Sequence, residues 1–389
     1  MNIRVLKQNA RDYGMYIALL VIMVTFTILT GGIFMSPRNL SNLFDQTGYV
    51  AVLAVGMTLI IIIRHIDLSV GFVAGFLGAV AAVLLKMGVG LPIVLACTII
   101  VGAIIGIYHG WLVASMGVPS FVASLAGMFI FRGALLRITE GTGTIIVESP
   151  FFNALGNGFI PDVFKGLISI EKVHVLTIVI GMVAVVAFII GELRVRGQKK
   201  KYNFEDSTLD MFIGKLLFIS ALILFFCWKL SQYNGISWTV VIVIVIVGAY
   251  HFFMNNTVLG RHVYAIGGNP EAAELSGIKV KAVTYFVFVS MSALAALAGI
   301  MFTARLQSAT TTAGTGFELD AIASAYVGGV SAAGGVGKVT GTIIGAIVMS
   351  SLSNGMNLVG VGISYQYIVR GLILVIAVLF DIQSRRVKI

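Results

Sequence analysis

The chain has 389 residues, of which 58% are hydrophobic and only 11% are charged, about half the charged share of an ordinary soluble domain. Its mean hydropathy of +1.02 leaves too little polar surface to cover a soluble globule of this size, so a soluble enzyme or binding protein is excluded. The net charge of +10 could indicate a nucleic-acid partner, but the positions of the basic residues give another explanation.

Long stretches without a charged residue predict helices that cross a membrane. Residues 13–37, 87–131 and 282–304 contain no Asp, Glu, Lys or Arg, and about 20 apolar residues suffice for one crossing. The first apolar run is too long for a signal-peptide core and lacks a small-x-small cleavage site, so it is predicted to be a retained span. In chain order the predicted spans lie near 14–34, 46–63, 69–87, 91–114, 119–137, 173–193, 212–230, 237–254, 282–303, 320–336, 340–359 and 365–382.

The distribution of Lys and Arg predicts the orientation of these spans. If the N-terminus is cytoplasmic, seventeen of the 26 basic residues fall on the inner side and seven on the outer side, with Arg132 and Arg370 at membrane depth. Inner loops of membrane proteins are enriched in Lys and Arg. Both termini are therefore expected inside, and much of the basic excess is accounted for without nucleic acid. The longest outer segment, about 139–172, is either a docking surface or a connector.

A cytoplasmic segment after the eighth span carries the signals of a short, rigid helix. Asn269 can cap its start, Pro270 suits the first helical position, Glu271 complements the positive end of the helix dipole, and Gly277 can terminate it. On the residues alone, an ordinary surface turn is an equal alternative.

Several motifs recur along the chain outside its middle part. They are Ile66–Gly71 (IDLSVG), Val118–Phe121 with Leu125–Gly127 and Phe131–Gly133, Leu259–Ile278, Thr312–Ala323, Gly328–Gly337, and Asn354–Leu358. Together these motifs resemble those of the ribose/xylose/arabinose/galactose permease family of ABC importers, over about 35–140 and 255–382. A further segment near 160–230 adds two spans joined by the basic loop Arg194–Lys201, and this longer form is similar to the xylose and multiple-monosaccharide permeases.

The resemblance implies an all-α, multi-pass permease of the inner membrane, one domain over 1–389 with about 10–12 spans, some of them interrupted or re-entrant. It implies alternating access for a monosaccharide, a separate cytoplasmic ATP-binding subunit, an external sugar-binding protein and a second permease copy, with no cofactor, metal or catalytic residue in this chain. The segment 255–281 would couple to the ATPase. Its expected coupling residues are Arg261, Asn269, Pro270, Glu271, Glu274 and Gly277. The candidates for the translocation pathway or pore structure are Asp67, Ser69, Ser120, Glu318, Asp320 and Ser331.

For two features the residues alone leave two interpretations open. Asp67 either caps the third span, assisted by Ser69 and paired with Arg64, or takes part in the pathway, since carboxylates at membrane depth are usually paired or functional. The glycine-rich stretch 328–341 indicates either an interrupted helix beside a buried or wet region or close helix packing through small residues.

Other functions find little support in the residues. A phosphate-binding loop would need glycine at position 332 and Ser or Thr at 339, where the chain has Ala332 and Val339. Histidines are scattered without a His-Glu-x-x-His motif, and Cys97 and Cys227 lie in apolar runs as packing residues. An ion-coupled secondary sugar carrier is the alternative function, but acidic residues lie almost wholly in loops or at span ends.

Overall fold

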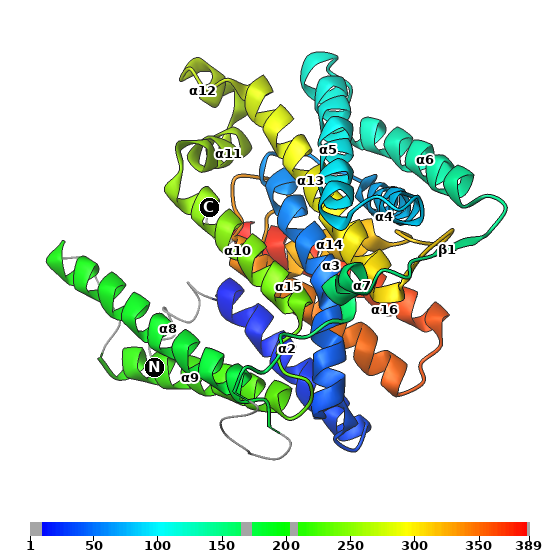
Figure 1. Ribbon diagram of the computed structural model, residues 1–389. Coiled ribbons are helices and arrows are strands. Elements are labelled where there is room, and N and C mark those ends of the chain that lie inside the picture. The colour runs from blue at the N-terminus through cyan, green and yellow to red at the C-terminus, as the bar shows by residue number, and fades with distance from the viewer. Residues whose placement is uncertain (1–9, 165–172, 203–208, 387–389) are drawn as a thin grey trace. The chain divides into compact units, whose positions relative to one another are not determined.

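The computed structural model describes residues 10–164, 173–202 and 209–386, and Figure 1 shows that this part of the chain is built from helices. A short 3-10 turn, Ile33–Met35, precedes α3, and a π-helical turn, Trp111–Ser115, extends α5. The two strands are β1 (Thr144–Ile146) and β2 (Ser308–Thr310). The helices are α2 (Ala10–Leu29), α3 (Pro37–Ile62), α4 (Val70–Lys86), α5 (Leu91–Gly110), α6 (Ser120–Thr139), α7 (Pro150–Asn157), α8 (Val175–Lys201), α9 (Leu209–Ser231), α10 (Trp238–Asn256), α11 (Val258–Gly268), α12 (Pro270–Leu275), α13 (Val280–Leu306), α14 (Phe317–Val327), α15 (Val339–Leu358) and α16 (Ile363–Arg386).

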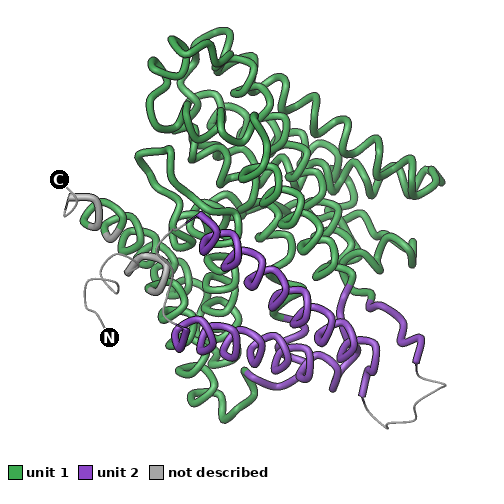
Figure 2. Tube along the Cα trace, turned by 90° about the vertical axis from the view of Figure 1, so that its left-hand side faces the viewer, with its two compact units in different colours: residues 1–34, 43–158, 238–389 green, residues 35–42, 159–237 purple. Residues whose placement is uncertain are grey.

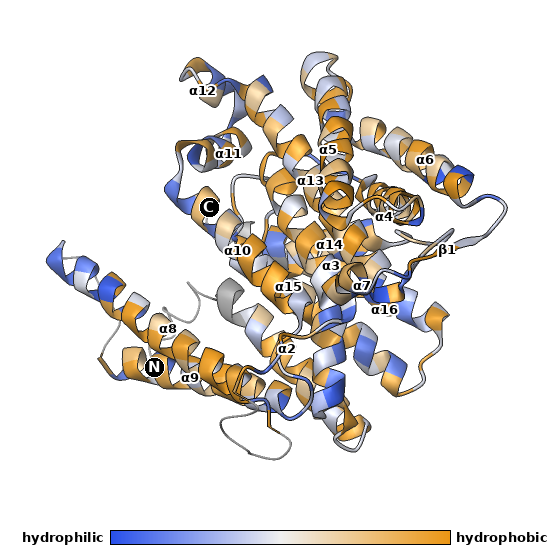
Figure 3. Ribbon diagram, viewed as in Figure 1, coloured by the Kyte–Doolittle hydropathy of each residue, from blue (hydrophilic) through white to orange (hydrophobic). Residues whose placement is uncertain are grey.

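The lengths and compositions of these helices confirm a multi-pass, all-α membrane protein. Within the described residues, nine helices are long and apolar enough to cross a bilayer, and two shorter apolar helices cover Gly14–Leu29 and Val70–Lys86. Figure 3 shows hydrophobic residues along most of α9 and α10, whereas α12 combines hydrophilic and hydrophobic residues. The predicted spans therefore correspond to observed helices, with one exception.

The span predicted at 320–336 is wrong. The helix α14 has 11 residues, which reach about 16 Å, roughly half of the ~30 Å hydrocarbon core. Its backbone leaves the helix at Gly328, and regular helix resumes only at Val339. Both interpretations of the glycine-rich stretch hold, because the chain is interrupted here and α15 also packs tightly on α14. A Cβ on Gly341 of α15 would collide with the carbonyl oxygen of Gly328 at the end of α14.

The chain divides into two compact units, coloured separately in Figure 2. Unit 1 comprises residues 1–34, 43–158 and 238–389, and unit 2 comprises 35–42 and 159–237. Unit 2 contains α8 and α9, which pack against each other and lie in the segment that the sequence predicts as an additional pair of spans.

The core of unit 1 is organised around α13, which packs along α4 and α5. Glycines permit the close approach: a Cβ on Gly106 of α5 would overlap the backbone of Val289, and one on Gly299 would overlap the carbonyl of Ala74 in α4. Small residues at such contacts are how helices associate within lipid, where no hydrophobic driving force acts between them. The fold is thus held by backbone proximity along α13.

Unit 1 has two ends with different structures. At one, here called the α7 end, β1 pairs antiparallel with β2, and the Asn157 side chain donates to the carbonyls of Ala304 (3.0 Å) and Arg305 (2.9 Å). The chain that follows α6 and the chain that follows α13 therefore meet at this end. The other, the α12 end, contains α11, α12 and the junction between α3 and α4.

In unit 2, Asp162 fixes the start of α8. Its carboxylate accepts hydrogen bonds from the backbone N–H groups of Val175 (2.7 Å), Leu176 (3.3 Å) and Phe164 (3.0 Å). The first two are among the donors that every helix start leaves without an intrahelical partner. Burial alone raises the pKa of this carboxyl, but the three N–H donors and the nearby His174 outweigh burial and lower the pKa of Asp162.

We expect Asp162→Ala to loosen the first turn of α8 at a cost of about 1–2 kcal/mol. Because the pKa is lower in the folded state, the stabilisation is present above the unfolded-state value of about 3.9 and is lost as the pH falls through the folded value. Hydrogen exchange of the amides at 175–178 should be faster in the variant at pH 7, with a difference that shrinks in acid. Asp162→Asn keeps one acceptor oxygen, so its exchange rates should lie between those of the wild type and of Asp162→Ala. Equal exchange in wild type and Asp162→Ala would contradict this role.

Candidate functional site

The short helix predicted at 269–277 is confirmed as α12. Asn269 is its N-cap, and the Asn269 Oδ1 accepts a hydrogen bond from the backbone N–H of Ala272 at 3.1 Å. Pro270 occupies the first helical position, and Gly277 follows the helix with a φ of +84°, a left-handed conformation that suits glycine. These three features were readable from the sequence because each is a local backbone requirement.

The outward surface of α12 combines charge with an apolar side chain. Glu271 and Glu274 are exposed, and Leu275 is 90% exposed. Arg261 is also exposed, one helix earlier on α11.

The helix α11 was not predicted, although its start carries a recognisable signal. The Thr257 hydroxyl accepts a hydrogen bond from the backbone N–H of Gly260 at 3.0 Å, a standard N-cap. Burial raises the pKa of the Tyr264 hydroxyl on this helix, and this hydroxyl donates to the carbonyl of Gly337 at 2.8 Å. Thus α11 is bonded to the loop that joins α14 to α15.

Three segments are tied together at the α12 end by hydrogen bonds to backbone carbonyl groups, an arrangement here called the backbone clamp. The Arg64 guanidinium donates through Nε to the carbonyl of Gly267 (2.7 Å) and through Nη2 to that of Gly268. The Gly335 N–H donates to the carbonyl of Ile62 at 2.9 Å. The clamp therefore joins the end of α3, the end of α11 and the glycine-rich loop, and Arg64 adopts a left-handed φ of +64° to do so.

The predicted pairing of Asp67 with Arg64 is wrong, because Arg64 is bonded within the clamp. Asp67 is fully buried, and its Oδ1 accepts from the backbone N–H (2.9 Å) and the hydroxyl (2.6 Å) of Ser69, the residue preceding α4. Its Oδ2 has no hydrogen-bond partner in the described residues. One residue away, the Ile66 N–H donates to the Ser120 hydroxyl at 3.3 Å. Asp67, Ser69 and Ser120 thus lie together at the α3–α4 junction.

The remaining pathway candidates lie in different places. Ser331 is buried in the glycine-rich loop, and its hydroxyl donates to Asp381 of α16 at 3.0 Å. Glu318 is buried at the start of α14, beside Gly71 of α4, and its Oε2 lacks a hydrogen-bond partner among the described residues. Asp320 lies one turn into α14 and faces a cavity.

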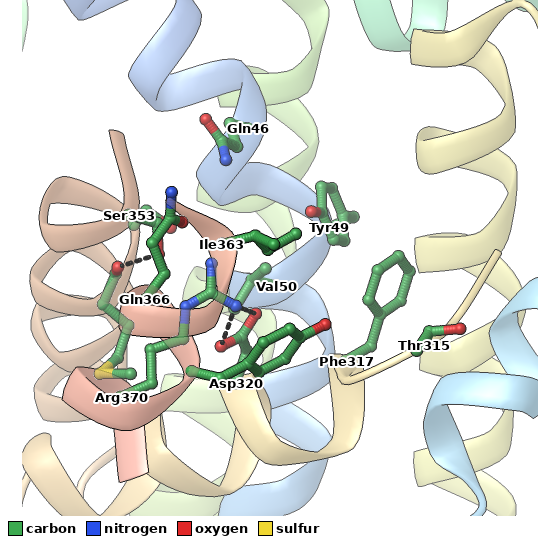
Figure 4. Close-up of a pocket in the computed structure, with 13 residues that line it drawn as sticks. Gln46, Tyr49, Val50, Thr315, Phe317, Asp320, Ser353, Ile363, Gln366 and Arg370 are labelled. Atoms are coloured by element: carbon green, nitrogen blue, oxygen red, sulfur yellow. Dashed lines mark hydrogen bonds and ion pairs between the residues drawn. The ribbon is translucent and has the colours of Figure 1, made fainter. Parts of the chain in front are cut away.

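This cavity of about 200 Å³ lies in unit 1 where α3, α14, α15 and α16 meet (Figure 4). Asp320 forms an ion pair with Arg370 of α16, whose Nη1 is 3.4 Å from both carboxylate oxygens. The positive end of the half-length helix α14 is directed into a region where helices are broken, a common design of transporter sites. The cavity is lined by Gln46, Tyr49, Val50, Thr315, Phe317, Asp320, Met349, Ser350, Ser353, Ile363, Gln366, Tyr367 and Arg370.

Apart from Asp320, the sequence analysis did not select the residues of this cavity, although Arg370 stood out as a charge at membrane depth. A signal was present: polar side chains recur three or four residues apart on otherwise apolar helices, as in Ser350 and Ser353, or Gln366 and Arg370. Such spacing places side chains on one helix face. What the sequence lacked was any indication that these faces meet.

Comparison with known proteins identifies the family. Residues 39–378 match a family described as branched-chain amino acid transport system / permease component. The chain is 39% identical to the xylose transport system permease protein XylH of Haemophilus influenzae, covering 97% of this chain and 98% of that protein. It is 38% identical to XylH of Escherichia coli K12 (97% and 93%) and 34% identical to the ribose import permease protein RbsC of the same strain (94% and 92%). No solved structure matches.

The chain therefore belongs to this permease family, in the branch of ABC sugar-importer permeases, and the resemblance inferred from its motifs is confirmed. The relatives are transport subunits, and the chain is a membrane permease rather than an enzyme.

The clamp yields a test with a neighbouring control. A Cβ on Gly267 would overlap the carbonyl of Ile62 and the backbone N of Gly335, whereas one on Gly268 would meet nothing within 4 Å. We expect Gly267→Ala to destabilise the permease by about 1–3 kcal/mol or more, and Gly268→Ala to be tolerated. Thermal unfolding of both purified variants measures the difference. Equal behaviour of the two alanines would show that the clamp does not constrain the fold.

Proposed function

We propose that this permease moves a monosaccharide across the cytoplasmic membrane by alternating access, driven by a separate ATP-hydrolysing subunit that docks on α12. The observation that carries the proposal is that α12 directly follows the end of α11, which the backbone clamp bonds to the end of α3 and thereby links to the glycine-rich loop. A rigid exposed helix linked in this way can transmit a displacement instead of absorbing it.

The surface of α12 supports the docking site. Glu271, Glu274 and Leu275 are exposed on a helix whose backbone is fixed at both ends by Asn269 and Gly277. An anchor that is rigid before binding loses less conformational entropy on docking. A groove with apolar and basic lining on the ATPase would complement these three side chains.

Xylose and ribose appear in the names of the relatives, which supports a monosaccharide, with a pentose favoured. The remaining partners of the proposed importer are an external sugar-binding protein at the α7 end and a second permease copy. The ion-coupled carrier is less well supported, because the Asp320 carboxylate in the cavity is already paired with Arg370.

Reversing the charge of α12 tests the docking site. We expect Glu271→Lys with Glu274→Lys to reduce sugar uptake at least tenfold, because the acids would meet their partner with the wrong sign, while expression and insertion remain normal. Asp210→Lys, an exposed acid outside the coupling segment, is the control. Uptake and sugar-stimulated ATPase activity would be measured with the complete importer. Normal uptake by the double variant at normal protein level would refute docking through these acids.

Labelling of single cysteines tests the orientation. In a background without Cys97 and Cys227, Phe151→Cys on α7 and Leu275→Cys on α12 both place a thiol at an exposed position. When the permease is expressed without its ATPase, an impermeant maleimide should label the first in intact cells and the second only after permeabilisation. Labelling of both from outside, or the reverse pattern, would contradict a cytoplasmic α12.

A further inference from the structure

The cavity at the start of α14 retains hydrogen-bonding groups that no described residue satisfies. Arg370 binds Asp320 through Nη1, but its Nε is buried and has no partner within the described chain. Gln366 uses its amide nitrogen for Asn357 Oδ1 (2.7 Å) and the carbonyl of Val361 (2.9 Å), so its position is fixed and its carbonyl oxygen remains available. Buried polar groups are nearly always paired in native proteins, so the Arg370 Nε calls for a ligand or water, and the Gln366 carbonyl oxygen offers an acceptor beside it.

An aromatic wall lies beside these polar groups. The rings of Tyr49 and Phe317 are 4.8 Å apart, and Phe302 contacts both, at 5.1 Å from Tyr49 and 4.8 Å from Phe317. Packing of this kind holds Tyr49 in place, and Figure 4 shows Tyr49 and Phe317 next to each other at one side of the cavity. The cavity thus offers apolar ring surface on one side and amide, hydroxyl and guanidinium groups on the other.

The charge of the cavity selects against ions. Its acid and base, Asp320 and Arg370, are joined in a pair and contribute no net charge. A free anion would be attracted by Arg370 but repelled by Asp320. A free cation would be attracted by Asp320 but repelled by Arg370. A neutral molecule with many hydroxyl groups could bind both partners of the pair, because a hydroxyl group donates to a carboxylate and accepts from a guanidinium.

From these observations we propose that the permease itself contains a monosaccharide-binding site in this cavity, formed by Tyr49, Gln366, Arg370 and Asp320. The proposal rests on the transport function proposed above and adds a site within the membrane, separate from any sugar-binding protein. The volume of about 200 Å³ lies below the ~300–1,000 Å³ of pockets for drug-sized ligands and suits a single small sugar. The sugar's C–H face would lie on the aromatic wall, with its hydroxyl groups toward Gln366 and the ion pair.

A branched-chain amino acid is the competing ligand, since its ammonium and carboxylate groups could separate Asp320 from Arg370. Three buried polar side chains of the lining, Ser350, Ser353 and Gln366, argue against it, because they offer hydrogen bonds that a Leu or Ile side chain cannot make.

The test uses purified permease in lipid nanodiscs without partner subunits, and saturation-transfer NMR with D-xylose, D-ribose or L-leucine. We expect saturation to be transferred from the permease to both pentoses, with D-xylose and D-ribose competing for one site, and little transfer to L-leucine.

Tyr49→Phe should weaken pentose binding about three- to tenfold. Its hydroxyl makes no hydrogen bond within the described residues, so the fold should be unaffected. Gln366→Ala should weaken binding further. Gln383→Ala is the matched control, because Gln383 is exposed on the same helix outside the cavity.

The outcomes separate this inference from the proposed function. Three results would refute the proposed binding site, even if the complete importer still transports sugar. They are saturation transfer to L-leucine alone, no transfer to any sugar, and equal sugar binding by the wild type and Tyr49→Phe. Uptake by cells carrying the complete importer is measured in parallel. Absence of sugar uptake there would instead contradict the transport function.

Discussion

The constraint on which the structure depends is the absence of water in the bilayer core, where every backbone N–H and C=O needs a partner inside the protein. A helix pairs its own backbone groups and so meets this requirement by itself. Where a helix is interrupted, the freed backbone groups must find partners elsewhere in the protein. In the glycine-rich loop the N–H groups of Val330, Ser331 and Gly335 bond to carbonyls of Ala325, Val336 and Ile62. The last of these bonds is long-range, and it is possible only because Gly267 and Gly335 carry no side chain to separate the segments.

Features that depend on neighbouring residues were predictable, and features that depend on long-range contacts were not. Asn269, Pro270 and Gly277 specify α12 through local backbone rules, and apolar runs specify the spans. By contrast, α14 was predicted as a full span because Gly328 to Val336 is nearly as apolar as a helix. Hydropathy does not record that the backbone has turned to bond with Ile62.

The candidate site was only partly predictable, for the same reason. Asp67 and Arg64 are three residues apart, which suggested a pair, yet the left-handed turn at Arg64 directs its guanidinium to the carbonyl of Gly267. Arg370 was conspicuous as a charge at membrane depth, and Asp320 was a candidate for the pathway. Their ion pair joins two helices fifty residues apart, and nothing in one sequence indicates which distant charges meet.

The helix α14 joins the cavity to the backbone clamp. The N-terminal turn of α14 carries Phe317 and Asp320 at the cavity, and its C-terminus leads into the loop held by Ile62, Tyr264 and the backbone clamp. Because α14 is only about 16 Å long and is packed tightly on α15 through glycine, it can move as a rigid body with little internal deformation. If an ATPase docks on α12 and a sugar binds in the cavity, as proposed above, a displacement of α12 would reach the Asp320–Arg370 pair through α14, and the sugar affinity of the cavity would change with the state of the ATPase. By linkage, a sugar bound there would favour one position of α12 to the same extent.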